Sequence, residues 1–264
     1  MNTSQSRTEG GSGTGKQPSR KGRQPKEKRG HPILRFFGRL IATLLCLGIM
    51  VGSLVAVAAV YESAVAVEAV KANETAWATL TGASSAVMGK AAAKLAGLNP
   101  ADYADMDAIA ASSTAMAAII GNSTALNAVV SSSTAMAAVA ASAVAVSAMA
   151  ASATARTVLQ ASPLKKVYSW IGGSWTANTL TAVSGSGLLL KVQVTNNSGG
   201  WSIPGKTGHK VLLDGSAFTA TNGYATSDIY QQSTNAVIDE SVRRYASHIK
   251  VYLYNATQIT YIPC

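Results

Sequence analysis

The chain has 264 residues, of which 13% are charged and 6% aromatic, and its formal net charge is +10. Ala and Val supply much of the apolar fraction and bury little area per residue, so we do not expect one dense core to span the whole chain. Residues 1–39 hold ten Lys/Arg and two Glu, a net of +8, so the basicity belongs to the N-terminus and does not indicate a nucleic-acid-binding protein as a whole.

Residues 1–32 are rich in Gly, Ser, Pro, Lys and Arg and lack apolar side chains, which predicts a disordered basic tail. The tail is interpreted as a solvated determinant of membrane topology or as a contact for anionic lipid headgroups. Nucleic acid is not an expected partner outside a packaged particle, because no aromatic residues are interleaved for base stacking.

Residues 33–61 form an apolar segment in which Leu40 to Tyr61 carry no charge over 22 residues. As a helix this run spans about 33 Å, enough for the hydrocarbon core of a bilayer. Arg35 and Arg39 precede it and Glu62 and Glu68 follow, which predicts a single-pass signal-anchor with a cytoplasmic N-terminus. A cleaved signal peptide and a buried helix in a protein assembly remain alternatives.

Residues 62–104 are rich in Ala, Val, Glu and Lys and predict a helical segment. Gly97 is a candidate helix end and Pro100 a candidate helix start. Asp102, Asp105 and Asp107 suit the first turn of a following helix.

Residues 105–162 contain a repeat of ten residues, with copies such as "ASSTAMAAII" and "SSSTAMAAVA". Ten residues are not a whole number of helical turns, so a continuous helix would carry its larger side chains around every side. We therefore expect each copy to be a short helix and a corner, with the Ser/Thr pairs at 113–114, 123–124 and 133–134 as N-caps. Stacked copies would form a solenoid stalk whose core is Met116, Ile119, Leu126, Val129, Met136 and Val139. A long Ala-rich helix in an oligomeric bundle is the alternative.

Residues 163–264 show alternating, β-branched stretches such as "GLLLKVQVTN" and "HIKVYLYNA", separated by clusters of Gly, Asn and Ser. This pattern predicts an antiparallel β-sandwich. Leu188, Leu190, Val192 and Val194 are expected on one face of a strand. The stretch "TNAVIDESVRRYASH" is expected to hold a short helix or a loop. The fold class is thus α+β and elongated.

The repeated "SSTAM-AV" unit, followed by a small β-domain ending in "YLYNATQITYIPC", resembles fibre proteins of tailed bacteriophages over residues 105–264. The resemblance implies an elongated virion appendage, commonly a homo-oligomer such as a trimer, whose distal end contacts a host surface. Residues 1–61 depart from the family, because such fibres normally begin with a domain that attaches to the particle.

The sequence offers little catalytic chemistry. The three histidines, His31, His209 and His248, lie in no metal-binding or catalytic motif, and Cys46 and Cys264 have no ligand spacing. We therefore expect no cofactor and no metal, and we do not expect an enzyme. Trp175 and Trp201, each beside glycines in expected loops, are the candidate ligand-binding residues, because exposed aromatic rings stack on sugars.

Together these features predict a fibre-like adhesion protein that is anchored in a membrane through residues 33–61, or carried in a virion. It would present the β-domain on a repeat stalk to a cell-surface glycan or protein. The alternative is a purely structural virion or phage-membrane protein whose β-domain is an oligomerisation cap. A host-envelope enzyme is a third class without supporting residues.

Overall fold

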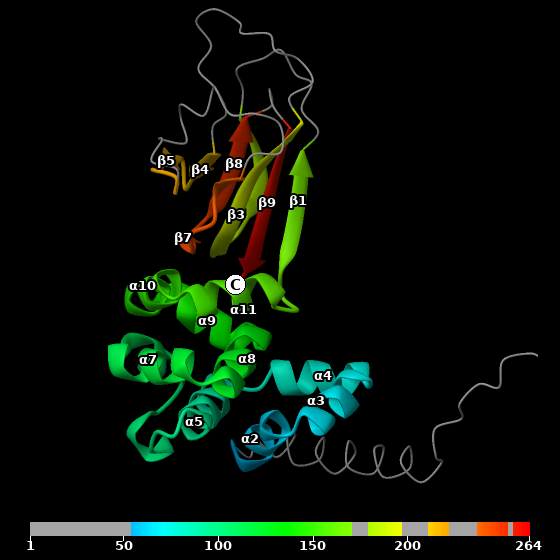
Figure 1. The fold of residues 1–264 in the computed structure, drawn as a ribbon, viewed down its shortest axis with the longest axis vertical. Helices are drawn as coiled ribbons and strands as arrows, with labels where there is room; N and C mark the ends of the chain where they lie inside the picture. Colours follow the sequence, from blue (N-terminus) through cyan, green and yellow to red (C-terminus); the bar gives the residue numbers. More distant parts are fainter. Residues whose placement is uncertain (1–53, 171–178, 197–210, 222–236, 253–255) are drawn as a thin grey trace, which may run out of the picture.

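The computed structural model describes residues 54–170, 179–196, 211–221, 237–252 and 256–264. The fold is α+β, with helices up to residue 161 and antiparallel sheets after residue 165 (Figure 1). The helical elements are α2 (Leu54–Glu62), α3 (Ala64–Lys71), α4 (Glu74–Thr81), α5 (Ser85–Leu95), η1 (Pro100–Asp102), α6 (Met106–Ala111), α7 (Ser113–Gly121), α8 (Ser123–Ser131), α9 (Ser133–Ala141), α10 (Ala143–Ala151) and α11 (Ala153–Ala161).

The expected tail and most of the expected membrane segment, residues 1–53, lie outside the described residues. Residues 54–61 form most of α2, and their side chains at Val57, Ala58 and Val60 are fully buried. α2 packs against α5 and α8, so this end of the apolar segment contacts protein. Among the described helices, none alone has the length and apolarity to cross a bilayer, although two bent pairs of repeat helices meet both criteria.

The repeat folds as short helices that break every ten residues. Ser112, Asn122, Ser132, Ser142 and Ser152 each accept a hydrogen bond from the backbone N–H three residues later and so begin the helices α7 to α11. The prediction that the Ser/Thr pairs are the N-caps is therefore wrong by one residue, because each cap is the residue before the pair. The residue before each pair has the extended backbone that an N-cap needs, whereas the pair itself opens the helix.

Successive repeat helices turn sharply, by 107° between α7 and α8 and by 100° between α9 and α10. Every helix contacts the third one after it, since α6 packs on α9, α7 on α10 and α8 on α11. Three helices therefore make one layer. The helices α6, α7 and α8 form the lower layer, and α9, α10 and α11 form the upper layer stacked on it. The alternative of one long helix is wrong, because each corner interrupts the helical hydrogen bonding.

The interior of the two layers is filled by positions that recur in every copy. The six expected core residues, Met116, Ile119, Leu126, Val129, Met136 and Val139, are all 0% exposed. An alanine three residues after each cap is also fully buried, which lets neighbouring helices approach closely; these are Ala115, Ala125, Ala135, Ala145 and Ala155. The same cluster includes buried residues of α2, α4 and α5, so the helical part has one continuous core.

α5 is joined closely to the first repeat helix. A Cβ on Gly89 would lie 2.2 Å from the backbone carbon of Asp105, so only glycine allows this approach. After α5, Gly97 adopts φ +75°, and the N–H of Leu98 donates to the carbonyl of Ala93. This is the glycine helix ending that was expected, and Pro100 begins η1 as expected.

The C-terminal part, here called the β-module, comprises residues 166–263 and two antiparallel sheets. One sheet has the order β1-β9-β3-β6 with β7 also pairing with β3, and the other has the order β2-β8-β4-β5. Buried side chains from both sheets, among them Leu189, Ile249 and Ile259, form one cluster between them. The strands are β1 (Lys166–Trp170), β2 (Thr179–Ser184), β3 (Gly187–Asn196), β4 (Val211–Leu213), β5 (Ser216–Ala217), β6 (Val237–Asp239), β7 (Arg243–Tyr245), β8 (His248–Tyr252) and β9 (Ala256–Pro263).

One expectation for the β-module was wrong, and another holds only in part. Leu188 and Leu190 pack into the helical core, but Val192 packs between the sheets. The pairing of β3 with β9 shifts between Leu189 and Lys191, and this bulge puts Val192 on the other face of the strand, whereas the side chain of Val194 lies outside the described part of the chain. The described part of the stretch expected as a short helix or a loop, residues 237–248, contains the strands β6 and β7, which pair with β3, and a loop at residues 240–242 between them.

Candidate functional site

The expected ligand-binding residues Trp175 and Trp201 lie outside the described residues, but the strands that lead to them are placed. β1 begins beside α11 and runs away from the helices to Trp170, and β3 runs in the same sense to Asn196 (Figure 1). Both segments that carry the tryptophans therefore leave the described structure at the end of the β-module farthest from the helices. We call this end the distal end.

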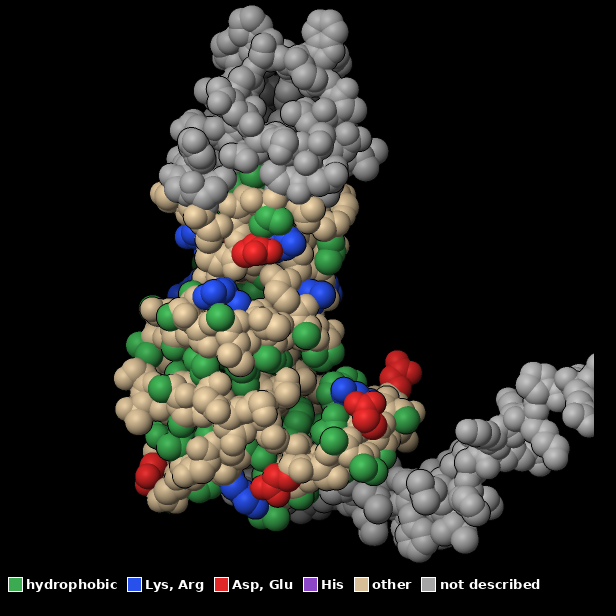
Figure 2. All heavy atoms as spheres, in the orientation of Figure 1, with side chains coloured by type: hydrophobic (Ala, Val, Ile, Leu, Met, Phe, Trp, Pro, Cys, Tyr) green, Lys and Arg blue, Asp and Glu red, His purple; other side chains and the backbone are tan. Residues whose placement is uncertain are grey.

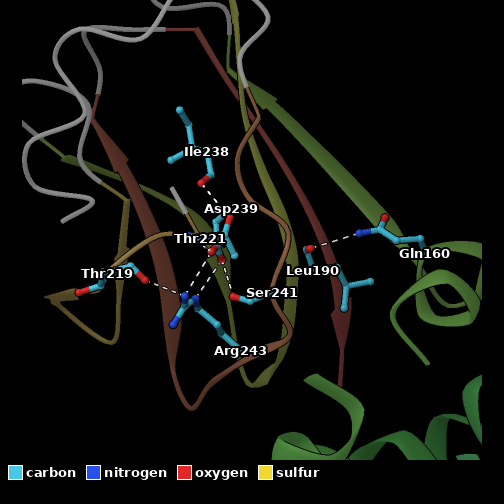
Figure 3. Close-up of polar contacts among 8 residues, drawn as sticks. All are labelled: Gln160, Leu190, Thr219, Thr221, Ile238, Asp239, Ser241 and Arg243. Carbon is cyan, nitrogen blue, oxygen red and sulfur yellow. Dashed lines mark hydrogen bonds and ion pairs between the residues drawn. The ribbon is translucent and has the colours of Figure 1, made fainter. Parts of the chain in front are cut away.

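A buried ion pair ties the segment before residue 222 to the strands after residue 236 (Figure 3). Asp239 is 0% exposed, and its carboxylate accepts from Arg243 Nε at 2.9 Å and from the Ser241 hydroxyl at 2.8 Å. The same carboxylate accepts from the N–H of Thr221 at 2.8 Å, while Arg243 Nη2 donates to the carbonyl of Thr219 at 2.6 Å. Because the chain itself supplies these partners, Asp239 acts as a structural clamp and not as a free catalytic carboxylate.

A second carboxylate organises a turn at the edge of the four-stranded sheet. Asp214 and Gly215 form the two-residue turn between β4 and β5, with φ values of +52° and +87°. The Asp214 carboxylate accepts from the N–H groups of Ala246, Ser247 and His248. Burial alone would raise the pKa of Asp214, but these hydrogen bonds and one from the Ser247 hydroxyl outweigh it and lower the pKa to about 2.

The carbonyl groups at the ends of the repeat helices have two different kinds of partner. In the lower layer, the Ser142 hydroxyl donates to the carbonyl of Ala110 in α6 at 2.6 Å, and the Ser162 hydroxyl donates to that of Val130 in α8 at 2.6 Å. Both hydroxyls belong to corners of the layer above. A serine at the corner thus serves as a helix cap and as a link between layers.

In the upper layer the partners are cations. Arg244 donates to the carbonyl of Ala141 in α9, Arg156 to that of Ala150 in α10, and Lys165 to that of Gln160 in α11. Figure 2 shows Lys and Arg side chains gathered where the helical body meets the β-module. Positive charge at a helix C-terminus stabilises the exposed carbonyls, so these cations end the stack where another layer would otherwise follow.

The β-module is attached to the upper layer by buried apolar side chains and by a hydrogen bond to one of its backbone carbonyls. Gln160 Nε2 donates to the carbonyl of Leu190 at 3.1 Å (Figure 3), and Leu188, Leu190 and Ile262 belong to the helical core. Cys264 packs against that core, and its thiol lies 3.4 Å from the carbonyl oxygen of Met136. Burial raises the pKa of the Cys264 thiol to about 11, so the group is a protonated packing element at neutral pH.

A cavity of about 490 Å³ lies between the segment α2–α4 and the helices α8 and α11. Its lining includes Tyr61, Trp77 and Asn127, which no local motif connects. Sequence reasoning missed it, because the cavity depends on how distant helices pack. The only local signal is the pair of aromatic residues in a segment otherwise made of small side chains.

Within the described ranges, no group of three or more His, Cys, Asp or Glu side chains could hold a metal ion. Neither the protein-family models nor the curated proteins with which the chain was compared match it.

Proposed function

We propose that this protein is a fibre-like adhesion protein of phage type that presents the distal end of its β-module to a host surface, with a glycan as the ligand. In this proposal the repeat is a short solenoid, the two sheets are a β-sandwich, and the protein acts without catalysis. In this proposal the apolar residues before α2 attach the protein to a membrane as a single-pass anchor with the basic tail in the cytoplasm. Residues 54–61, which pack against α5 and α8, belong to the folded part and not to the anchor.

The observation that carries the proposal is the seating of the β-module on the upper helical layer. The core residues Leu188, Leu190 and Ile262 join the helical cluster, and cations satisfy the helix ends at the same boundary. Module and repeat therefore share a packed, partly apolar boundary, which suits a part that holds a binding surface at a defined place on the repeat. The distal end lies opposite this boundary (Figure 1).

The rigid interior of the repeat also supports a structural role. Its core columns consist of alanine, methionine and aliphatic residues that are fully buried, and its corner hydroxyls serve as caps and links. Side chains of this kind set the spacing between helices and hold the layers together, as in other stacked repeats.

A second candidate is a structural protein whose β-module assembles copies of the chain, forming a homo-oligomer such as a trimer. The feature that favours it is β1, which pairs with β9 alone among the described strands and leaves Val167 52% exposed. A strand at the edge of a sheet can pair with a strand of another chain.

The test compares binding with assembly in the full chain, reconstituted in phosphatidylcholine vesicles. Binding to host cells and to a glycan array is measured for the parent and for the double variant Trp175→Ala/Trp201→Ala. Val144→Ala, which alters an exposed side chain of α10 away from both the distal end and β1, is the control. We expect the double variant alone to lose at least about tenfold in binding.

Two results would count against the adhesion proposal. If a correctly folded parent chain binds neither cells nor glycans and sediments as a defined oligomer, the structural role is favoured. If deletion of residues 33–53 leaves the distribution between membrane and soluble fractions unchanged, the anchor is refuted.

A further inference from the structure

The stack of repeat helices continues below the lower layer. α5 packs on α8 and α2 packs on α5, so the column that α8 and α11 form is extended downward with the same spacing of three helices. The helices between α2 and α5 also begin as the repeat helices do, because Ser63 caps α3 and Asn73 caps α4, ten residues apart. The repeat therefore reaches back to α2.

α2 is the lowest helix of this column within the described part of the chain. It has nine residues, as α7 has, and Val57 and Val60 are fully buried at positions four and seven after Ser53. The same two positions form the buried column in the later copies. Figure 1 shows α2 and α3 at the end of the molecule opposite the β-module, so α2 ends the stack as a repeat helix.

The two ends of the stack are finished differently. At the upper end the β-module covers the helices and cations bind the helix carbonyls. At the lower end Val55 in α2 is 58% exposed and Val65 in α3 is 80% exposed, the two highest values for large hydrophobic side chains among the described residues. Ala59 of α2 is exposed as well, whereas Ala128 at the equivalent position of α8 is 0% exposed. Stacked repeats need a polar outer face at each end to remain soluble, and Val55 and Ala59 do not provide one.

The chain that enters α2 indicates what lies beside this end. In the proposed function, on which the present inference rests, the apolar residues before α2 are a membrane anchor. Residues 33–53 as a helix would be about 31 Å long, which matches the hydrocarbon thickness of a bilayer, so the anchor is complete at Ser53. Val55 follows two residues later and lies at most about 7 Å from Ser53, a distance comparable with the depth of the headgroup layer.

The charges at this end favour neutral lipids. Residues 62–107 hold six Asp/Glu and three Lys, a net of −3, so anionic headgroups would be repelled. The exposed side of α2 becomes polar with distance from the anchor, because Val55 and Ala59 are followed by Glu62. A helix with this order places its apolar end toward the acyl chains and its carboxylate toward water.

We propose that the lower end of the stack rests on the bilayer, with the side chains of Val55 and Val65 in the headgroup layer of a neutral membrane. The lipid then covers apolar surface at this end, as the β-module does at the upper end. Because the β-module lies at the opposite end of the molecule (Figure 1), the contact directs the distal end away from the membrane. A chain held by the anchor alone would have no defined direction.

The test places spin labels on the full chain reconstituted in phosphatidylcholine vesicles. Cys46→Ala and Cys264→Ala remove the native thiols, and Val55→Cys or Val65→Cys carries the label. Val144→Cys, at an exposed valine of α10, is the matched control. Molecular oxygen concentrates in lipid, whereas a nickel chelate stays in water. We expect oxygen to relax the labels at 55 and 65 more strongly than the nickel chelate does, and the control to show the reverse order. Circular dichroism of each labelled chain checks that the fold is kept.

Three results would overturn the proposal, and they separate it from the anchor. If the chain floats with the vesicles but the nickel chelate relaxes both labels more strongly than oxygen, this end faces water and the anchor alone stands. If both labels are shielded from both reagents, protein such as a second copy of the chain covers this end. If the chain does not float with the vesicles at all, the anchor is refuted and the contact with lipid is refuted with it.

Discussion

The corner serine Ser142 has two tasks whose separate contributions can be measured. It caps α10 by accepting from the N–H of Ala145, and it donates to the carbonyl of Ala110 one layer below. Ser142→Ala removes both bonds. The lost cap costs about 1 kcal/mol, and the part-buried carbonyl without its donor costs about 1 kcal/mol more. We therefore expect the free energy of unfolding to fall by about 2 kcal/mol and the melting temperature by about 4–8 °C.

Ser152→Ala is the matched control for this prediction. Ser152 caps α11 by accepting from Ala155, and within the described part of the chain its hydroxyl makes no link to another layer. The control is expected to lose about 1 kcal/mol, the cost of a cap alone. Chemical denaturation followed by circular dichroism gives both values. Equal losses in the two variants would refute the idea that the corner hydroxyl of Ser142 stabilises the stacking of layers.

Three further predictions concern close packing, pH and buried charge. Gly89→Ala is expected to lower the free energy of unfolding by more than about 2 kcal/mol, because the new Cβ meets the backbone of Asp105. Gly121→Ala, which has open space around the new Cβ, is expected to raise it by roughly 0.5 kcal/mol. Paired thermal melts compare the two variants. The lowered pKa of Asp214 means that its contribution to stability is complete above about pH 4 and is lost as the pH falls to about 2. Asp214→Asn, which also tolerates the positive φ, should therefore lower stability at pH 7 and flatten the acid limb of a stability profile; an unchanged profile would contradict this. Arg243→Met should cost about 3–5 kcal/mol by leaving the Asp239 carboxylate buried without its cation, and full stability in denaturant would show that the pair is not a clamp.

The sequence predicted the features that depend on local chemistry. The ten-residue spacing of Ser, Met and Ile or Val indicated short helices with a buried column, and these are what the structure contains. Gly97 and Pro100 marked a helix end and start correctly, because their backbone preferences are local. The alternating residues of "HIKVYLYNA" likewise predicted a strand where β8 lies.

Other features depend on contacts that no local pattern carries. The bulge at Leu190 follows from how β3 pairs with β9, and it reversed the expected face of Val192. The strands β6 and β7 exist because β3 offers them partners, although their own residues resemble a loop or short helix. The cavity at Tyr61 arises from helices that are far apart in the sequence, and the segments with Trp175 and Trp201 lie outside the described residues.

The stacking of three helices per layer has a consequence for how such a chain can change in length. Adding one decapeptide would rotate everything after it by about a third of a turn, so the β-module would face a new direction relative to α2–α4. Adding three would lift the module by one layer and restore its original heading. Gaining or losing thirty residues would thus keep the direction of the β-module relative to α2–α4, whereas gaining or losing a single copy would change that direction.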